Sequence, residues 1–155
     1  MSTWNRAPLL MQGLDSIFAQ NYEPLEVVVV DDGSEDNTKE ICSFYPVKYI
    51  YLEANGWGGQ SRAMNVGIKN AHYPLMIMQS PEIVHLTSNT IERLLSVIKN
   101  DDRLWAVAAV TRQQENPFLP PIEADRSPAA FFLSALWRHQ LLNIRGLWLK
   151  VQFKV

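Results

Sequence analysis

Two adjacent aspartates, Asp31 and Asp32, directly follow a run of four valines at positions 27–30. A carboxylate at the end of a buried strand can accept hydrogen bonds from a nucleobase N–H or a sugar hydroxyl. Two neighbouring charges beside so apolar a run cost desolvation energy, and Gly33 after them lets the backbone approach a ligand closely. Such carboxylates can instead cap the next turn or helix. We favour ligand binding for the pair and capping for Asp36.

Two other segments carry weaker signals of the same kind. Residues 2–6 place the ring of Trp4 among polar side chains before a predicted helix, where it could stack on a planar base or pack near the chain end. Residues 55–59 form a glycine-rich loop that leads toward Arg62 at the start of a helix. A helix N-terminus and a guanidinium both suit phosphate, although glycines and a surface arginine are equally common in structural loops.

The hydrophobic pattern alternates between helical spacing and short apolar runs typical of buried strands. Helical spacing covers residues 8–20, 61–71 and 90–98, a short helix follows Asp36, and the strand-like runs are 25–30, 47–52, 75–78 and 104–110. This alternation predicts a three-layer α/β/α, Rossmann-like fold with a mostly parallel sheet and helices on both faces. Ligands of such folds bind beyond the carboxyl ends of the strands, where the loops at Asp31, Asn55 and Gln79 would meet.

The alternation stops beyond residue 112. Residues 112–128 are rich in proline and are expected to form a long surface loop. Residues 129–143 carry an apolar pattern compatible with a helix or a strand, and residues 147–155 alternate as an edge strand would. The single cysteine, Cys42, is expected to be a small buried hydrophobic residue.

Composition limits the class of protein. The 155 residues suit one compact domain, and a hydrophobic fraction of 47% supports a substantial core. The net charge of −2 gives no basic field that would indicate a nucleic-acid partner. No apolar stretch approaches the ~20 residues of a membrane span, and no signal peptide opens the chain. We therefore expect no transmembrane segment and a cytoplasmic location, with peripheral attachment to a membrane left open.

Two blocks of the sequence resemble the family 2 glycosyltransferases of GT-A fold. The first block comprises Asn5-Arg6, Leu14-Asp15-Ser16-Ile17, Gln20-Asn21-Tyr22 and the stretch from Glu26 through Asp31-Asp32-Gly33-Ser34 to Thr38. The second comprises Asn55-Gly56-Trp57-Gly58-Gly59, the stretch from Arg62 to Ile68, and Ala71. The resemblance covers about residues 1–112 and, more weakly, 129–146. It implies a nucleotide-sugar-binding part in residues 1–112 and a partial acceptor-side segment of the same domain in residues 113–155.

The resemblance also implies roles for individual residues. Trp4 would stack on the nucleotide base, which in this family is commonly uracil, and Ser2 would touch the base or ribose. Asp32 would accept the base N–H with Asp31 beside it, and Arg62 would approach the diphosphate. The family transfers a sugar, in a hexosyltransferase-type reaction with inversion, from a nucleoside-diphosphate donor to a glycan, lipid or protein acceptor. It usually uses Mg²⁺ or Mn²⁺, which balances the charge of the leaving diphosphate.

The chain departs from the family pattern in two donor-side features. A strand normally precedes the segment around Trp4, so we expect the sheet to lack a central strand. The family's metal-binding aspartates, separated by one residue, normally follow the third predicted strand, but Gln79 and a Ser-Pro pair stand there. Glu82 is the nearest carboxylate and His85 a further possible ligand, because hard cations prefer carboxylate oxygens. Glu82 and His85 are therefore the metal-site hypothesis, with loop packing the alternative for His85.

The acceptor side departs as well, because no carboxylate side chain follows Asp125. A general base must reach the proton that it removes, so we name no catalytic residue, and the chain looks truncated at both ends. Two interpretations stay open: an active glycosyltransferase, or a catalytically inactive nucleotide-sugar-binding remnant of one. A phosphorylation receiver is rejected because Gln79 stands where it needs an aspartate. A haloacid-dehalogenase-type phosphatase is rejected because Asp31 and Asp32 are adjacent, whereas that class needs one residue between its aspartates.

Overall fold

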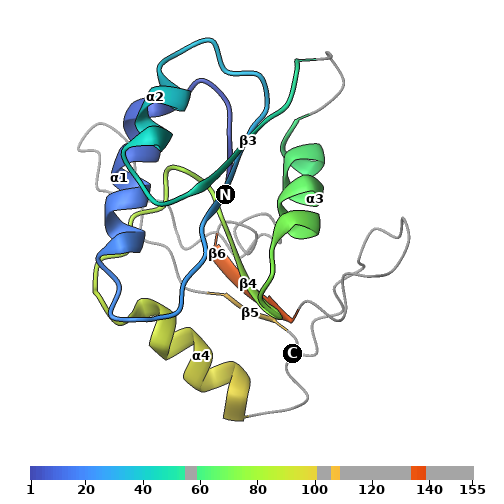
Figure 1. Ribbon diagram of the computed structural model, residues 1–155. Helices are drawn as coiled ribbons and strands as arrows, with labels where there is room; N and C mark the ends of the chain where they lie inside the picture. Colours follow the sequence, from blue (N-terminus) through green and yellow to red (C-terminus); the bar gives the residue numbers. More distant parts are fainter. Residues whose placement is uncertain (55–58, 101–105, 109–133, 139–155) are drawn as a thin grey trace, which may run out of the picture.

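The computed structural model describes residues 1–54, 59–100, 106–108 and 134–138 (Figure 1). The elements in chain order are β1 (Ser2–Thr3), α1 (Ala7–Phe18), β2 (Val28–Asp31), α2 (Thr38–Ser43), β3 (Lys48–Tyr51), α3 (Gln60–Asn70), β4 (Leu75–Gln79), α4 (Thr90–Asn100), β5 (Ala106–Ala108) and β6 (Ser134–Arg138). Within the described residues, the helices and strands that the sequence predicts are present, with ends displaced by a few residues.

Strands β1, β2 and β3 form a parallel sheet in that order. Thr3 of β1 is paired with Asp31 of β2, and the backbone nitrogen of Met1 extends the ladder by donating to the Val28 carbonyl oxygen at 2.8 Å. We expected the sheet to lack the strand before Trp4. The structure has a short strand there, β1, which has two residues and is the outer strand of this sheet.

The valine run of β2 contacts helices on both faces of the sheet, because successive side chains of a strand point to opposite sides. Val27 and Val29 pack with side chains of α1 and α2, whereas Val28 and Val30 pack against Ala63 of α3. Figure 1 shows α1 and α2 on one side of β2 and β3, with α3 on the other. The prediction of a strand buried on both faces is confirmed, and the three-layer arrangement follows from it.

Strands β4, β6 and β5 form a second sheet in that order, and β6 runs antiparallel to both neighbours. The segment 129–143, for which the sequence left helix or strand open, thus contributes the antiparallel strand β6. The apolar side chains of α4 pack against Leu75 and Ile77 of β4. The predicted loop at 112–128 and edge strand at 147–155 lie outside the described residues.

Candidate functional site

Asp31 and Asp32 have different partners although they are adjacent. The side chain of Asp31 is only 1% exposed; its Oδ2 accepts a hydrogen bond from the Tyr49 hydroxyl at 2.7 Å and its Oδ1 accepts one from the Ser34 amide at 2.8 Å. The carboxylate of Asp32 instead faces the start of α3. The two neighbouring aspartates therefore differ: the carboxylate of Asp31 is buried in the interior, whereas that of Asp32 lies where β2 ends.

The edge carboxylate, Asp32, lies at the N-terminus of α3. Its Oδ2 accepts a hydrogen bond from the Gly59 amide at 2.6 Å, and its Oδ1 lies 3.4 Å from Nη1 of Arg62. The same guanidinium nitrogen donates to the Glu53 carbonyl oxygen at 2.9 Å. Gly59 reaches this position with φ 78° and ψ −175°, a backbone region that is essentially restricted to glycine. A cation and a helix start beside a carboxylate suit a ligand that carries both a donor group and negative charge.

The backbone of Trp4 lies near that of Asp32 at the carboxyl ends of β1 and β2. The Asp32 amide donates to the Thr3 carbonyl oxygen at 2.9 Å, so the residue that follows Thr3 is the neighbour of Asp32. The Trp4 side chain is 60% exposed, which leaves its faces available for stacking. The structure thus pairs the Asp32 and Arg62 side chains and places the backbone of Trp4 near that of Asp32, while their role as nucleotide contacts stays a prediction.

Hydrogen bonds tie the loop after β2 to the residues that follow Trp4. The Asn5 amide donates to Ser34 Oγ at 2.9 Å, and the Glu35 amide donates to Asn5 Oδ1 at 2.8 Å. Asn5 has a φ of 49°, a left-handed conformation that asparagine tolerates better than most residues. The two loops therefore hold each other through reciprocal contacts.

Asp36 caps two helices at once. Its Oδ2 accepts a hydrogen bond from the Ala7 amide at the start of α1, at 3.0 Å, and its Oδ1 accepts from the amide of Thr38 at the start of α2, also at 3.0 Å. Burial alone would raise the pKa of Asp36, but the hydrogen bonds from Thr38 and Ala7 outweigh it and lower the pKa. The capping role predicted for Asp36 is confirmed.

At the end of β4, polar side chains pair with one another. Gln79 Nε2 donates to the Ile83 carbonyl oxygen at 2.9 Å, so its Oε1 faces His85 Nε2 at 2.7 Å. Because an amide oxygen only accepts, the proton on the His85 ring belongs on Nε2. Burial lowers the pKa of His85, which favours the neutral ring.

Glu82, the other member of the metal-site hypothesis, forms an ion pair with Arg6. In the part of the chain that the structure describes, no group of three or more histidine, cysteine, aspartate or glutamate side chains could hold a metal ion. Hard cations such as Mg²⁺ take about six oxygen ligands. A carboxylate neutralised by an arginine and an imidazole bonded to a glutamine do not make such a set. The described residues therefore do not fit the predicted Mg²⁺ or Mn²⁺ site.

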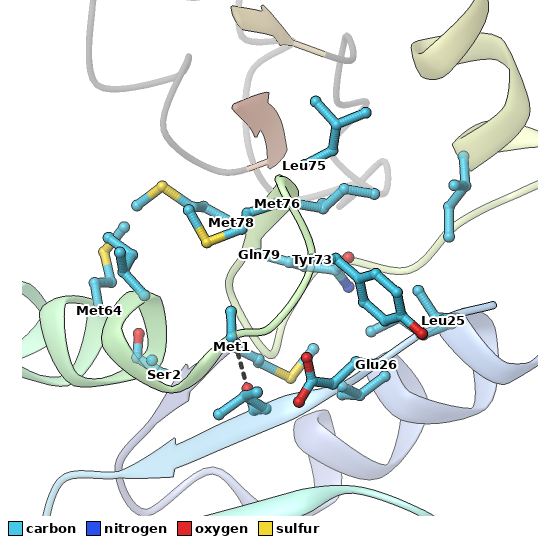
Figure 2. A pocket seen from close by; sticks show the side chains of 18 of the residues that line it. Met1, Ser2, Leu25, Glu26, Met64, Tyr73, Leu75, Met76, Met78 and Gln79 are labelled. Atoms are coloured by element: carbon cyan, nitrogen blue, oxygen red, sulfur yellow. Dashed lines mark hydrogen bonds between the residues drawn. The ribbon is translucent and has the colours of Figure 1, made fainter. Parts of the chain in front are cut away.

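A cavity of about 350 Å³ lies between β2 and β4 (Figure 2). Its wall is mainly apolar and includes methionine and leucine side chains from β4, α3 and the segment before β2: Met76, Met78, Leu75, Met64 and Leu25. Ser2 lines this cavity, but Trp4, Asp31, Asp32 and Arg62 do not. Ser2 is thus separated from the other predicted nucleotide contacts, which lie at the sheet edge.

Tyr49 is the polar residue of this region that the sequence did not single out. It lies in a stretch predicted only as a strand, and its hydroxyl reaches the carboxylate of the neighbouring strand. Burial and the hydrogen bond to Asp31 raise the pKa of Tyr49, so its hydroxyl stays a donor at neutral pH. Burial, with a contribution from the charge of Asp31, also raises the pKa of Cys42 to about 11. Cys42 is 3% exposed, which confirms its prediction as a buried small residue.

Comparisons with known proteins agree with this architecture. The model of Glycosyl transferase family 2 matches residues 1–148. The glycosyltransferase GlyG of Streptococcus pneumoniae serotype 4 is 30% identical over 104 residues, covering 64% of this chain and 34% of GlyG. The mannosyltransferase PcManGT from Pyrobaculum calidifontis, solved with GDP-Man and Mn²⁺, aligns with a TM-score of 0.70 and 23% identity over 94% of this chain and 45% of its own. Staphylococcus aureus TarS 1-349 with UDP-GlcNAc aligns with a TM-score of 0.65 and 22% identity over 91% and 44%.

The parallel sheet between helix layers and these structural matches define an α/β protein of GT-A fold. The chain belongs to glycosyl transferase family 2. It spans 34% of the length of the curated relative GlyG and under half of the two solved structures. None of the helices that the structure describes is long and apolar enough to cross a membrane.

Proposed function

We propose that this chain binds the nucleotide part of a nucleoside-diphosphate sugar at the carboxyl ends of β1 and β2. One observation carries the proposal: the exposed Trp4 follows Thr3, whose carbonyl oxygen accepts from the Asp32 amide, and the carboxylate of Asp32 lies 3.4 Å from Arg62. A flat aromatic face, a hydrogen-bond acceptor and a fixed cation match the three chemical parts of such a ligand, which are the base plane, the base N–H and the diphosphate.

In this proposal Trp4 stacks on the base, Asp32 accepts the base N–H and Arg62 neutralises phosphate charge. Asp32 already accepts a hydrogen bond from Gly59, but a carboxylate offers about four lone-pair sites and so retains capacity for the base. Ser2 lines the separate cavity between β2 and β4 and is not assigned a ligand contact. Asp31 is enclosed by Tyr49 and Ser34 and would support the site from below without touching the ligand.

We infer that the donor is a UDP-sugar. Uracil presents a single ring N–H, which one carboxylate oxygen can accept. The complex of TarS with UDP-GlcNAc supports this choice, whereas the complex of PcManGT with GDP-Man makes a guanine donor the natural competitor. The same comparison supports a divalent cation in the family, which would balance the leaving diphosphate, although Glu82 and His85 do not supply a fitting site.

The proposed reaction is inverting transfer of the sugar to a glycan, lipid or protein acceptor. Residues 1–112 would bind the donor and residues 113–155 would contribute to the acceptor side. The second candidate is a nucleotide-sugar-binding protein without turnover. Loss of a general base alone costs about 10²–10⁴-fold in rate, so binding and turnover separate the two candidates.

Calorimetric titration with UDP, GDP and TDP, with and without Mn²⁺, tests the proposal. We expect UDP to bind most tightly and Asp32→Ala to weaken it by about tenfold or more, the size of one hydrogen bond to a charged group. Glu40→Ala, which removes an exposed carboxylate from α2, is the matched control and should leave the UDP affinity unchanged. Equal UDP affinity in the wild type and Asp32→Ala would remove the base-binding role.

A further inference from the structure

A buried carboxylate, Asp31, sits beneath the proposed nucleotide site without being able to reach a ligand. Its side chain is 1% exposed, and both of its oxygens accept hydrogen bonds from within the protein. Burying a carboxylate is expensive unless hydrogen bonds compensate the lost water. The Tyr49 hydroxyl, at 2.7 Å from Oδ2, is the side-chain donor that meets this need.

The other oxygen of Asp31 begins a path of hydrogen bonds to the Trp4 loop. Oδ1 accepts from the Ser34 amide, and Ser34 Oγ accepts from the Asn5 amide at 2.9 Å. Asn5 follows Trp4 directly, and its left-handed φ of 49° is a conformation that needs support from its surroundings. The position of Trp4 therefore depends on Ser34, whose own position depends on Asp31.

The two anchors of Trp4 lie on either side of it in the sequence. Before it, the Thr3 carbonyl oxygen accepts from the Asp32 amide at 2.9 Å; after it, the Asn5 amide is held by Ser34. The first anchor belongs to the sheet ladder and does not need Tyr49. The second anchor depends on the orientation of the Asp31 carboxylate, which Tyr49 fixes.

We propose that Tyr49 is a positioning residue of the nucleotide site: through Asp31 and Ser34 it holds the loop that presents Trp4 to the base. The assignment of the ligand rests on the proposed function, but the positioning of the loop does not. Tyr49 makes no contact with the ligand in this scheme. Its removal loosens one loop and leaves the parallel ladder of β1, β2 and β3 in place.

The chain offers a matched control for Tyr49→Phe. Tyr45 also donates its hydroxyl to an aspartate, Asp15 Oδ1, at 2.7 Å, but this pair joins the end of α2 to α1 and has no connection with the Trp4 loop. Tyr45→Phe therefore removes the same chemical group and a hydrogen bond of the same length to an aspartate, one that is exposed where that of Tyr49 is partly buried. A general effect of losing a tyrosine–aspartate pair appears in both variants, whereas a positioning effect appears only in Tyr49→Phe.

Two measurements decide the question. Amide hydrogen exchange should become faster at Asn5, Ser34 and Glu35 in Tyr49→Phe and stay at wild-type rates there in Tyr45→Phe. Calorimetry should show UDP affinity reduced by roughly tenfold in Tyr49→Phe, about the effect of one lost hydrogen bond to a charged group, and unchanged in Tyr45→Phe. Ser34→Ala removes the hydroxyl oxygen that accepts from the Asn5 amide, so exchange at Asn5 should become faster in this variant too. This variant gives the test if Tyr49→Phe folds poorly. Ser34→Thr keeps the hydroxyl and should exchange at the wild-type rate.

Wild-type exchange rates at the three amides in both Tyr49→Phe and Ser34→Ala would overturn the positioning role, as would equal losses of UDP affinity in the two tyrosine variants. Failure of the proposed function is a separate result, because it appears in the wild type as an absence of UDP binding. In that event the exchange rates still decide whether Tyr49 holds the loop.

Discussion

The ends of β2 and β4 carry polar loops of opposite character. After β2, backbone amides bind the side chains: Asp31, Ser34 and Asp36 accept from amides of their own loop and of residues 5–7. After β4, side chains bind one another or a carbonyl, as in the Gln79–His85 contact and the ion pair of Glu82 with Arg6. The side chains of the loop after β2 are therefore held by backbone amides, whereas the side chains of the loop after β4 are held mainly by other side chains.

The difference shows how donor recognition and metal binding can be separated within one fold. Fixing the loop after β2 leaves Trp4 exposed and Asp32 at the edge, which is what recognition of a base requires. Pairing the side chains after β4 leaves the described residues without a set of oxygen ligands that fits a hard cation. On this comparison the first region presents the groups that the proposed nucleotide site needs, whereas the described residues of the second region do not form a metal site.

The largest expected effect comes from Gly33, which fixes the first loop. It has a φ of 86°, and a Cβ added there would lie 2.8 Å from the Cβ of Ala54. Gly59 also has a positive φ, 78°, but a Cβ there meets nothing within 4 Å. Backbone strain on the order of 1–3 kcal/mol applies to both alanine variants, and overpacking adds about 1–3 kcal/mol at Gly33 alone.

Urea unfolding of Gly33→Ala and Gly59→Ala measures this difference directly. We expect the free energy of unfolding of Gly33→Ala to be lower than that of Gly59→Ala by about 1–3 kcal/mol, because only the new methyl group at position 33 meets Ala54. If the two variants were equally stable, the loop after β2 would be able to shift away from Ala54 and would not be held as firmly as its hydrogen bonds suggest.

A smaller effect is expected at Trp4. Stacking of a base on an aromatic side chain contributes about 1–3 kcal/mol, so Trp4→Ala should weaken UDP binding by roughly 5- to 150-fold. Phe44→Ala removes another exposed aromatic ring, 74% exposed at the end of α2, and should leave the affinity unchanged. Calorimetry on both variants checks this, and a fall of the same size in each would assign the effect to general surface changes.

Glu82 provides the complementary test of the second region. Because its carboxylate pairs with Arg6 and no other ligands gather around it in the described part of the chain, Mn²⁺ should bind equally to the wild type and to Glu82→Ala. Stability should fall by no more than about 1 kcal/mol, as for other partly exposed ion pairs. Metal titration gives the answer, and weaker Mn²⁺ binding in Glu82→Ala would restore the metal-site hypothesis drawn from the sequence.

The sequence predicts the fold well because the signals were local and repeated. Four valines in a row can be buried on both faces only inside a sheet covered by two layers, and Val27 to Val30 pack in that way. What it could not predict was how the strands divide between sheets. The pairing of β4 with β6 joins segments more than 50 residues apart, and no local pattern encodes the partner of a strand.

The candidate site follows from the sequence in part for the same reason, and its ligand contacts stay a prediction. Trp4, Asp32 and Arg62 belong to motifs at strand ends, and strand ends meet at one edge of a parallel sheet. The division between Asp31 and Asp32 was not predictable, because it depends on Tyr49 of another strand reaching inward. The pairing of Glu82 with Arg6 likewise depends on two loops that meet only in the folded chain.

The smallest expected effect, a difference in pH dependence, would sharpen the comparison of the two loops. Burial lowers the pKa of His85 below its ordinary 6.5, so the unfolded chain binds this proton more readily than the folded protein. Stability should therefore decline as the pH falls below about 6.5, and His85→Gln should remove the contribution of His85 to that decline. Asp36 also has a lowered pKa, set by hydrogen bonds that outweigh its burial, relative to an ordinary 3.8. Its contribution is present above that value and is lost as the pH falls through the folded pKa. Burial also lowers the pKa of the Met1 amino group to about 6, so part of the upper decline belongs to that group. Thermal unfolding between pH 8 and pH 3 should thus show two declines, and His85→Gln should reduce the upper one and leave the lower one unchanged. A single decline near pH 4 in the wild type would mean that protonation of the His85 ring is accommodated within the fold, and that the loop after β4 is less firmly closed than its contacts suggest.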